Sequence, residues 1–295
     1  MALGNLAQRF LVAVVAVPIL LGILYIENPL PVWGLILVAS AIAMHEFFAM
    51  TLPKEDRAAA VVLGLITCVV FYWTDPLALV AFAKYLPHSF MKLPFAGQTL
   101  VLLCAVVVPM LFFLFKFRDI PTVAARVTAT VMGIVYAGLL TTYLAKLKLL
   151  RFHGIDSRHV GAYSVLTVLL IAWLADTGGY FAGRFIGGAK LYEAVSPKKT
   201  WAGAIGGLVG SIIGVAGLKL LFATYLSWVD VFLLAIPGGI LGQMGDLAES
   251  LIKRATGVKD SGALLPGHGG ILDRIDAVLF IAPYVYTYLA LRFAL

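Results

Sequence analysis

The feature of this sequence that most constrains its fold is a series of apolar runs, each long enough to cross a membrane. A helix of about 20 predominantly apolar residues spans the hydrocarbon core of a bilayer. We predict nine such spans, at residues 6–26, 31–50, 58–74, 98–117, 126–147, 161–176, 202–223, 229–252 and 270–293. Backbone polar groups at membrane depth need partners within their own segment, so these runs predict helices. The expected fold class is an all-α polytopic membrane protein with about nine transmembrane helices.

The composition excludes an ordinary soluble protein. Hydrophobic residues make up 62% of the 295 positions and charged residues only 13%, whereas a soluble domain has about 25% charged residues. Cys68 and Cys104 lie inside apolar runs without a C-x-x-C or Cys/His cluster, which indicates neither a disulfide framework nor a zinc site. The formal net charge of +7 suits a protein that lies against anionic headgroups or binds phosphate-rich ligands.

The positions of lysine and arginine predict the orientation of the chain. They place the N-terminus and the loops at 177–201 and 253–269 on the cytoplasmic side of the membrane. Lys146, Lys148, Arg151 and Arg158 crowd one loop on the opposite side, where we interpret them as charges that set topology. The sequence contains no Ser-, Gly- or Pro-rich linker and no internal repeat of the kind found in inverted-repeat transporters.

Several polar and aromatic residues of the first half fall near predicted span ends. Trp33, Tyr72 and Trp73 are interpreted as residues of an interfacial aromatic belt. His45 and Glu46 form a polar pair near the end of the second span, and we expect this pair to extend toward the membrane surface, with a functional buried pair as the alternative. These residues therefore have structural explanations.

The pattern changes after about residue 170, where acidic and basic residues occur together among many glycines. The acids are Asp176, Glu193, Asp246, Glu249, Asp260, Asp273 and Asp276. Carboxylates at membrane depth are costly unless they are paired or bind cations, so such a cluster predicts a functional site. We accordingly divide the chain into N-terminal transmembrane helices at 1–160 and a C-terminal catalytic transmembrane region at 161–295.

Helical spacing places the acids of two segments on common faces. Asp246, Glu249 and Lys253 share one face at positions i, i+3 and i+7, and Asp273 and Asp276 share another. If the two helix ends meet, the converging carboxylates suit Mg²⁺ that is bridged to substrate phosphates. An ordinary surface ion-pair ladder is the alternative, but both helices are otherwise apolar.

Two loops add donors and positive charge. ATGVKDSGALLPGHGG, at 255–270, is too rich in Gly and Pro to be helical, and its glycines let backbone N–H groups approach phosphate oxygens. SPKKTWAGAIGG, at 196–207, precedes the seventh span and favours anion binding at a helix N-terminus. The run WLADTGG places Asp176 at the cytoplasmic end of the sixth span.

The stretch SLIKRATGVKDSGALLPGHGGILDRID, Ser250 to Asp276, resembles the signature of the CDP-diacylglycerol synthases, also called phosphatidate cytidylyltransferases. WLADTGGYFAGRFIG and SPKKTWAGAIGG agree with the same family, so the resemblance covers residues 170–280 closely. Ala202 departs from the family pattern, since many relatives carry Glu there. The resemblance implies that a phosphatidate oxygen attacks the α-phosphorus of CTP and that pyrophosphate leaves.

Roles follow from the resemblance together with the pattern of charges. The expected catalytic residues are Asp246, Lys253, Asp273 and Asp276, and the three acids among them are the expected metal ligands. The expected substrate-binding residues are Asp176, Ser196, Lys198, Lys199, Thr200, Arg254, Lys259, Asp260, His268 and Arg274. Mg²⁺ is the expected cofactor, and a second cation is left open.

The resemblance also implies the partners and the location of the chain. The partners are CTP, phosphatidic acid and the lipid bilayer, with no nucleic acid, and a homodimer is left open. The expected location is the bacterial inner membrane, with a polar active site that faces the cytoplasm. A CTP-dependent kinase of a lipid alcohol and a cation-coupled transporter are the alternatives. A transporter would distribute its acids over several broken helices near the midplane.

Overall fold

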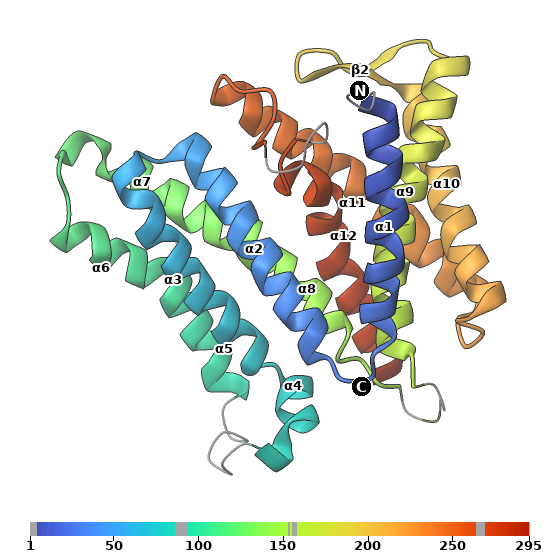
Figure 1. Cartoon of the computed structure of the whole chain (residues 1–295), viewed down its shortest axis with the longest axis horizontal. Coiled ribbons are helices and arrows are strands. Elements are labelled where there is room, and N and C mark those ends of the chain that lie inside the picture. The colour runs from blue at the N-terminus through green and yellow to red at the C-terminus, as the bar shows by residue number, and fades with distance from the viewer. Residues whose placement is uncertain (1–4, 86–93, 153, 155–157, 264–268, 295) are drawn as a thin grey trace. The chain divides into compact units, whose positions relative to one another are not determined.

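The computed structural model describes residues 5–85, 94–152, 154, 158–263 and 269–294. The described chain is built almost entirely from helices, with one short two-stranded sheet (Figure 1). It forms two compact units. Unit 1 comprises Met1–Leu149 and Asp260–Leu272, and unit 2 comprises Leu150–Lys259 and Asp273–Leu295. The signature segment, Ser250 to Asp276, is therefore divided between the two units.

Unit 1 is helical wherever it is described before Leu149. Its α-helices are α1 (Asn5–Tyr25), α2 (Leu30–Thr51), α3 (Lys54–Trp73), α4 (Pro76–Ala81), α5 (Pro94–Leu102), α6 (Val108–Phe115), α7 (Ile120–Gly133) and α8 (Leu140–Leu147). A 3₁₀ turn at Ala83–Tyr85 follows α4, and π-helical turns at Leu103–Val107 and Ile134–Leu139 join α5 to α6 and α7 to α8. The helices α2, α3 and α8 pack together as the centre of this unit (Figure 1).

Unit 2 contains four long helices and the hairpin. They are α9 (Val160–Phe185), β1 (Lys190–Tyr192), β2 (Ser196–Thr200), α10 (Trp201–Leu221), α11 (Trp228–Ala255) and α12 (Leu272–Leu289), followed by a π-helical turn at Ala290–Ala294. The first residue of α12, Leu272, groups with unit 1. Helix α9 packs along α10, and α11 lies against both of them (Figure 1).

The all-α membrane fold is confirmed. Seven described helices are long and apolar enough to cross a membrane, and they coincide with seven of the predicted spans. Two further apolar helical segments, Val14–Tyr25 within α1 and Thr99–Phe115 across α5 and α6, lie at the two other predicted spans. Large apolar side chains cover the outside of these helices, as in α10, where Ile205, Val209 and Ile213 are more than half exposed at four-residue intervals. A lipid environment satisfies such a face, whereas water does not.

The loop predicted at 177–201 is only partly a loop. Helix α9 continues to Phe185, and the remainder turns through Gly187 and Gly188, which have φ values of 66° and 91°. The strands β1 and β2 then pair in an antiparallel hairpin. Three- and five-residue strands carry too few alternating apolar positions to be recognised in the sequence.

Glycines explain the close packing of α9 against α10. A Cβ atom on Gly206 would lie 2.7 Å from the carbonyl oxygen of Gly178, closer than real side chains approach. A Cβ atom on Gly203 would likewise lie 3.0 Å from the carbonyl oxygen of Gly179. Small residues that let helix backbones approach are the usual means of helix association in membranes, where the hydrophobic effect provides little force between helices.

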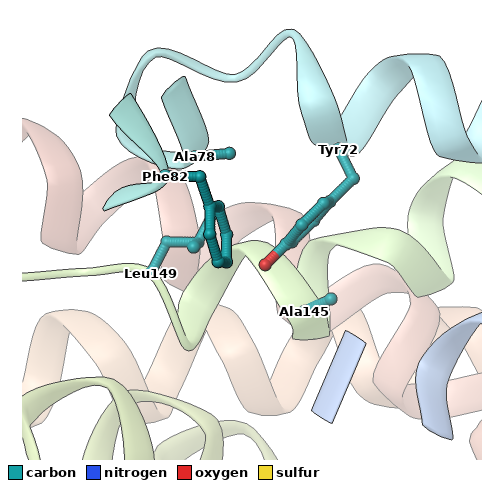
Figure 2. Packing of buried hydrophobic residues seen from close by; sticks show 5 residues of the cluster. All are labelled: Tyr72, Ala78, Phe82, Ala145 and Leu149. Carbon is teal, nitrogen blue, oxygen red and sulfur yellow. The ribbon is translucent and has the colours of Figure 1, made fainter. Parts of the chain in front are cut away.

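An apolar cluster closes one end of unit 1, where α3, α4 and α8 meet. Figure 2 shows its members, which are Tyr72, Ala78, Phe82, Ala145 and Leu149. The ring of Tyr72 is fully buried and lies 5.6 Å from those of both Trp33 and Trp73, measured between centroids. The interpretation of Tyr72 as an interfacial belt residue was therefore wrong, because its side chain belongs to the packed interior.

Buried ion pairs join the helices of unit 1. Arg126 of α7 and Asp56 of α3 are 2.7 Å apart, and both side chains are almost completely buried. Lys146 pairs with Asp75 at 2.8 Å, and Lys148 donates a 2.6 Å hydrogen bond to a carbonyl oxygen at the end of α1. The sequence places Lys146 and Lys148 in a loop, but the structure places Lys146 in α8 and Lys148 at its C-terminal cap, and both are buried contacts within the unit.

Candidate active site

A cavity of about 220 Å³ lies in unit 2, lined by α9, α10, α11, α12 and the hairpin. Its charged lining residues are Asp176, Lys198, Lys199 and Asp246, of which α9 and α11 contribute the two acids and β2 the two lysines. Much of its remaining wall consists of glycine and alanine. A cavity walled by small side chains, with charges of both signs, can accept a phosphate group together with a cation.

The hairpin and the start of α10 position the lysines. Thr200 is the N-cap of α10, and its Oγ1 accepts a 3.1 Å hydrogen bond from the N–H of Gly203. This cap fixes the end of β2 directly above the helix N-terminus. Lys199, the residue before the cap, forms an ion pair with Asp246 of α11. The predicted anion-binding loop thus contains a strand and a capped helix start.

A second charged cluster joins α11 to α12. The Nζ atom of Lys253 lies 2.5 Å from Oε2 of Glu249, one turn earlier on α11, and 2.6 Å from Oδ1 of Asp273 on α12. Glu249 and Asp273 are 0% and 8% exposed in their side chains. The two helix ends therefore meet, which the sequence analysis left as a condition.

Close backbone approach brings the acids of α11 and α12 near one another. A Cβ atom on Gly245 would lie 2.6 Å from the carbonyl oxygen of Asp276, and one on Gly242 would lie 2.9 Å from Cδ1 of Ile281. Glycine at both positions lets α12 pack directly on α11. Asp276 consequently experiences the negative charges of Asp246, Glu249 and Asp176. Nearby cations or bound protons offset such like charges in a medium of low dielectric constant.

The predicted site residues of unit 2 fall into two groups. Those that line the cavity are Asp176, Lys198, Lys199, Thr200 and Asp246. In the described structure, five others lie outside this lining, namely Ser196 in β2, Lys253 and Arg254 at the end of α11, and Asp273 and Arg274 at the start of α12. Asp276 also lies outside the lining but interacts electrostatically with Asp176 and Asp246.

Three further predicted residues belong to the signature loop. Lys259 is exposed at the last position before the chain enters unit 1, and Asp260 is the exposed first residue of the unit 1 segment. His268 lies outside the described residues. The prediction that residues 255–270 are not helical is confirmed for the described positions after Ala255.

The site residues expected from the sequence did not include Gln243 and Glu249, which the structure places at these clusters, nor Glu46 of unit 1. Gln243 lines the cavity one turn before Asp246 and donates a 3.0 Å hydrogen bond to the carbonyl oxygen of Ala204. Glu249 is part of the buried cluster with Lys253, and its position three residues after Asp246 was the available signal. Glu46 is the third, and its contacts lie in unit 1.

Glu46 is buried, with 5% exposure, and is not a residue that extends to the membrane surface. Its Oε1 accepts a 3.0 Å hydrogen bond from the N–H of Ile271, and its Oε2 accepts bonds of 2.8 Å from the N–H of Leu272 and 3.2 Å from the hydroxyl of Ser261. The sequence offers no local signal for this contact because more than 200 residues separate the partners.

The residues present fit a divalent cation only together with a substrate. Among the described residues, no three His, Cys, Asp or Glu side chains are arranged to hold a metal ion by themselves. Mg²⁺ is normally held by one or two carboxylates, with phosphates and water completing its shell, so a full protein cage is not required. Asp246 is accessible at 31% of its side chain, and Oε1 of buried Glu249 has no hydrogen-bond partner in the described structure.

Comparisons with known proteins agree with these features. A model of the cytidylyltransferase family matches residues 7–292. A phosphatidate cytidylyltransferase of Synechocystis is 30% identical over 311 residues, which cover 96% of each chain. Two others match over shorter segments. Those of Staphylococcus saprophyticus and Brucella suis are 41% and 40% identical over 52% and 53% of this chain. In both alignments the chain spans about half of the relative's length, namely 55%.

Proposed function

The chain belongs to the cytidylyltransferase family, and on this basis we propose that it is a phosphatidate cytidylyltransferase that converts CTP and phosphatidic acid into CDP-diacylglycerol and pyrophosphate. The observation that carries the proposal is the glycine-walled cavity in unit 2, which combines two lysines with two carboxylates within a bundle of membrane-spanning helices. The reaction needs a site at membrane depth where a lipid phosphate and a nucleotide polyphosphate bind next to one another.

The reaction requires little covalent chemistry from the protein. A phosphate oxygen of phosphatidic acid forms a bond to the α-phosphorus of CTP, while the bond from this phosphorus to the bridging oxygen of the β-phosphate breaks. Pyrophosphate carries away the electron pair. The attacking phosphate is already ionised near neutral pH, so positioning and charge stabilisation are the main demands on the protein. No strong general base is needed.

The lysines of β2 provide charge stabilisation in this scheme. Lys198 is exposed and Lys199 is half-buried, and both line the cavity, so their ammonium groups are available to polyphosphate oxygens there. The N-terminus of α10, directly after Thr200, adds the positive end of a helix dipole to the same wall. Ser196, Arg254, Lys259, His268 and Arg274 remain proposed contacts to the substrate phosphates.

The acids of unit 2 are proposed to hold Mg²⁺ together with the substrate phosphates. Asp246, Asp273 and Asp276 are the proposed ligands, and Asp176 contributes negative charge to the same region. The bound cation supplies charge neutralisation for the attacking and leaving oxygens. The ion pair with Lys199 balances the negative charge of Asp246. In the proposed mechanism, Lys199 leaves Asp246 when its ammonium group binds the substrate phosphates.

The location of the site follows from the same proposal. Bacterial relatives and seven apolar helices support an integral protein of the bacterial membrane. We propose the inner membrane, with the lysine-bearing hairpin on the cytoplasmic side, where CTP is made. A homodimer stays a prediction.

A pair of labelled nucleotides tests the reaction with the purified chain in detergent. We expect CTP labelled at the α-phosphate to transfer its label to lipid in the presence of phosphatidic acid and Mg²⁺. CTP labelled at the γ-phosphate should yield only labelled pyrophosphate. Transfer of the γ-label to a lipid alcohol would instead identify a kinase, and no consumption of CTP would refute both assignments.

A further inference from the structure

The carboxylate of Glu46 contacts both ends of the segment Asp260–Leu272 in unit 1. Ser261 donates to it near the start of the segment, and Ile271 and Leu272 donate to it at the end. Glu46 itself lies on α2, a helix that contributes no other predicted site residue. A single buried side chain thus contacts both described ends of this glycine-rich segment.

The surroundings of Glu46 are shaped to admit this contact. A Cβ atom on Gly262 would lie 2.6 Å from Oε1 of Glu46, and a Cβ atom on Gly270 would collide with the same carboxyl group. Glycine at both positions therefore lets the backbone of the segment pass against α2. Hydrogen bonds from backbone N–H groups to a carboxylate are charge-assisted and stronger than those between neutral groups.

The contact also defines where α12 begins. Leu272 is the first residue of α12, and its N–H is one of the helix donors that has no acceptor within the helix. Glu46 fills this role from another helix, and its negative charge suits the positive end of the helix dipole. Leu272 directly precedes Asp273 in the chain, so the contact with Glu46 lies one residue from a proposed metal ligand.

We propose that Glu46 is a positioning residue of the cytidylyltransferase, which holds the two described ends of the segment Asp260–Leu272, the second of them directly before Asp273, in the conformation that the reaction requires. This inference rests on the proposed function. Glu46 is not offered as a catalytic residue, because both of its oxygens are occupied by donors of unit 1. Within the described residues its partners are N–H and O–H donors, so it serves the loop backbone rather than balancing a lysine or an arginine.

The substitution Glu46→Gln tests the anchor with minimal change of shape. Whichever way the amide is oriented, its NH₂ group faces a backbone N–H that previously had an acceptor. We expect peptides that contain Ile271 and Leu272 to exchange their amide hydrogens faster in this variant. We also expect kcat to fall about 10- to 100-fold, the size of effect caused by displacing a reacting group by about 1 Å.

Two further variants separate positioning from general destabilisation. Glu55→Gln is the matched control, because Glu55 belongs to the same unit but forms an exposed ion pair with Arg118. We expect it to leave both the exchange of Ile271 and Leu272 and the value of kcat unchanged. Ser261→Ala removes only one of the three donors, so it should cause a smaller change of the same kind, and it carries the test if Glu46→Gln does not fold.

The outcomes distinguish this proposal from the proposed function. Unchanged exchange at Ile271 and Leu272 in Glu46→Gln would show that no anchor exists. Faster exchange with an unchanged kcat would show that the anchor does not position reacting groups, and it would equally overturn the proposal. A wild-type chain that never forms CDP-diacylglycerol would refute the proposed function, whereas the exchange measurement would still decide whether Glu46 holds the loop.

Discussion

Replacing Lys253 by Met should destabilise the protein strongly, independently of any effect on catalysis. The ammonium group of Lys253 faces the carboxylates of Glu249 and Asp273. The formal charge of this three-residue cluster is −1, and it becomes −2 when the lysine is removed. The carboxylates of Glu249 and Asp273 are 0% and 8% exposed, so water cannot compensate for the loss. Removing one partner of a buried ion pair typically costs about 3–5 kcal/mol. For a chain of this size, that cost lowers Tm by roughly 6–20 °C.

Thermal unfolding in detergent, followed by loss of the monodisperse peak, measures this effect. Lys219→Met is the matched control, because Lys219 in unit 2 lies 5.3 Å from the centre of the Trp228 ring, an interaction worth only about 0.5–1 kcal/mol at a partly exposed site. The double variant Lys253→Met with Glu249→Gln removes one of the two buried carboxylate charges of the cluster, so it should recover part of the lost stability. A Tm for Lys253→Met equal to that of the control would refute the argument that Lys253 balances buried charge.

Three further predictions test the site, its topology and the packing around it. Asp246→Ala should abolish CDP-diacylglycerol formation with little loss of expression, because the side chain of Asp246 is 31% exposed. Asp273→Ala should be equally inactive. Normal turnover of either variant at ordinary Mg²⁺ would remove that residue from the proposed metal site. Topology can be tested with single cysteines that replace Lys198, Lys259 or Arg158 in a background lacking Cys68 and Cys104. Cysteines at 198 and 259 should react with an impermeant reagent from the same side of sealed vesicles, and a cysteine at 158 from the other side. Labelling of 198 and 259 from opposite sides would contradict the proposed shared site. Gly206→Ala should cost about 1–3 kcal/mol through overpacking against α9, whereas Gly217→Ala on the same helix, where a Cβ meets nothing within 4 Å, should be neutral or slightly stabilising; equal melting temperatures would contradict the close-packing argument.

Features that depend on local periodicity could be predicted from the sequence. Seven of the predicted spans coincide with membrane-length helices because lipid imposes a length and a composition on each segment separately. The contact between Glu249 and Lys253 follows from helical spacing alone. The meeting of Lys253 with Asp273 requires two helix ends to converge, and helical spacing, which concerns one segment at a time, left this convergence as a condition.

Features that depend on distant contacts could not be predicted in this way. Glu46 is a polar residue near the end of an apolar helix, and nothing nearby in the sequence distinguishes a buried anchor from a residue at the membrane surface. Lys146 and Lys148 resemble the flanking charges of a span, yet buried partners hold both of them. In each case the deciding partner lies in another helix, so local patterns contain no record of it.

The two lysine clusters of unit 2 differ in a way that bears on how the site can work. Lys199 and Asp246 are 27% and 31% exposed, and ion pairs of this kind contribute only about 0–1 kcal/mol, so their partners can be exchanged at little cost. Lys253, Glu249 and Asp273 are 12%, 0% and 8% exposed, and breaking such a buried arrangement is expensive. The exposed pair is therefore the one able to open for an incoming phosphate and cation. The buried cluster is suited to hold α11 and α12 in place meanwhile. In the proposed reaction we therefore expect Lys199 to contact the substrate, and Lys253, which the sequence predicts as catalytic, to stabilise the framework of the site.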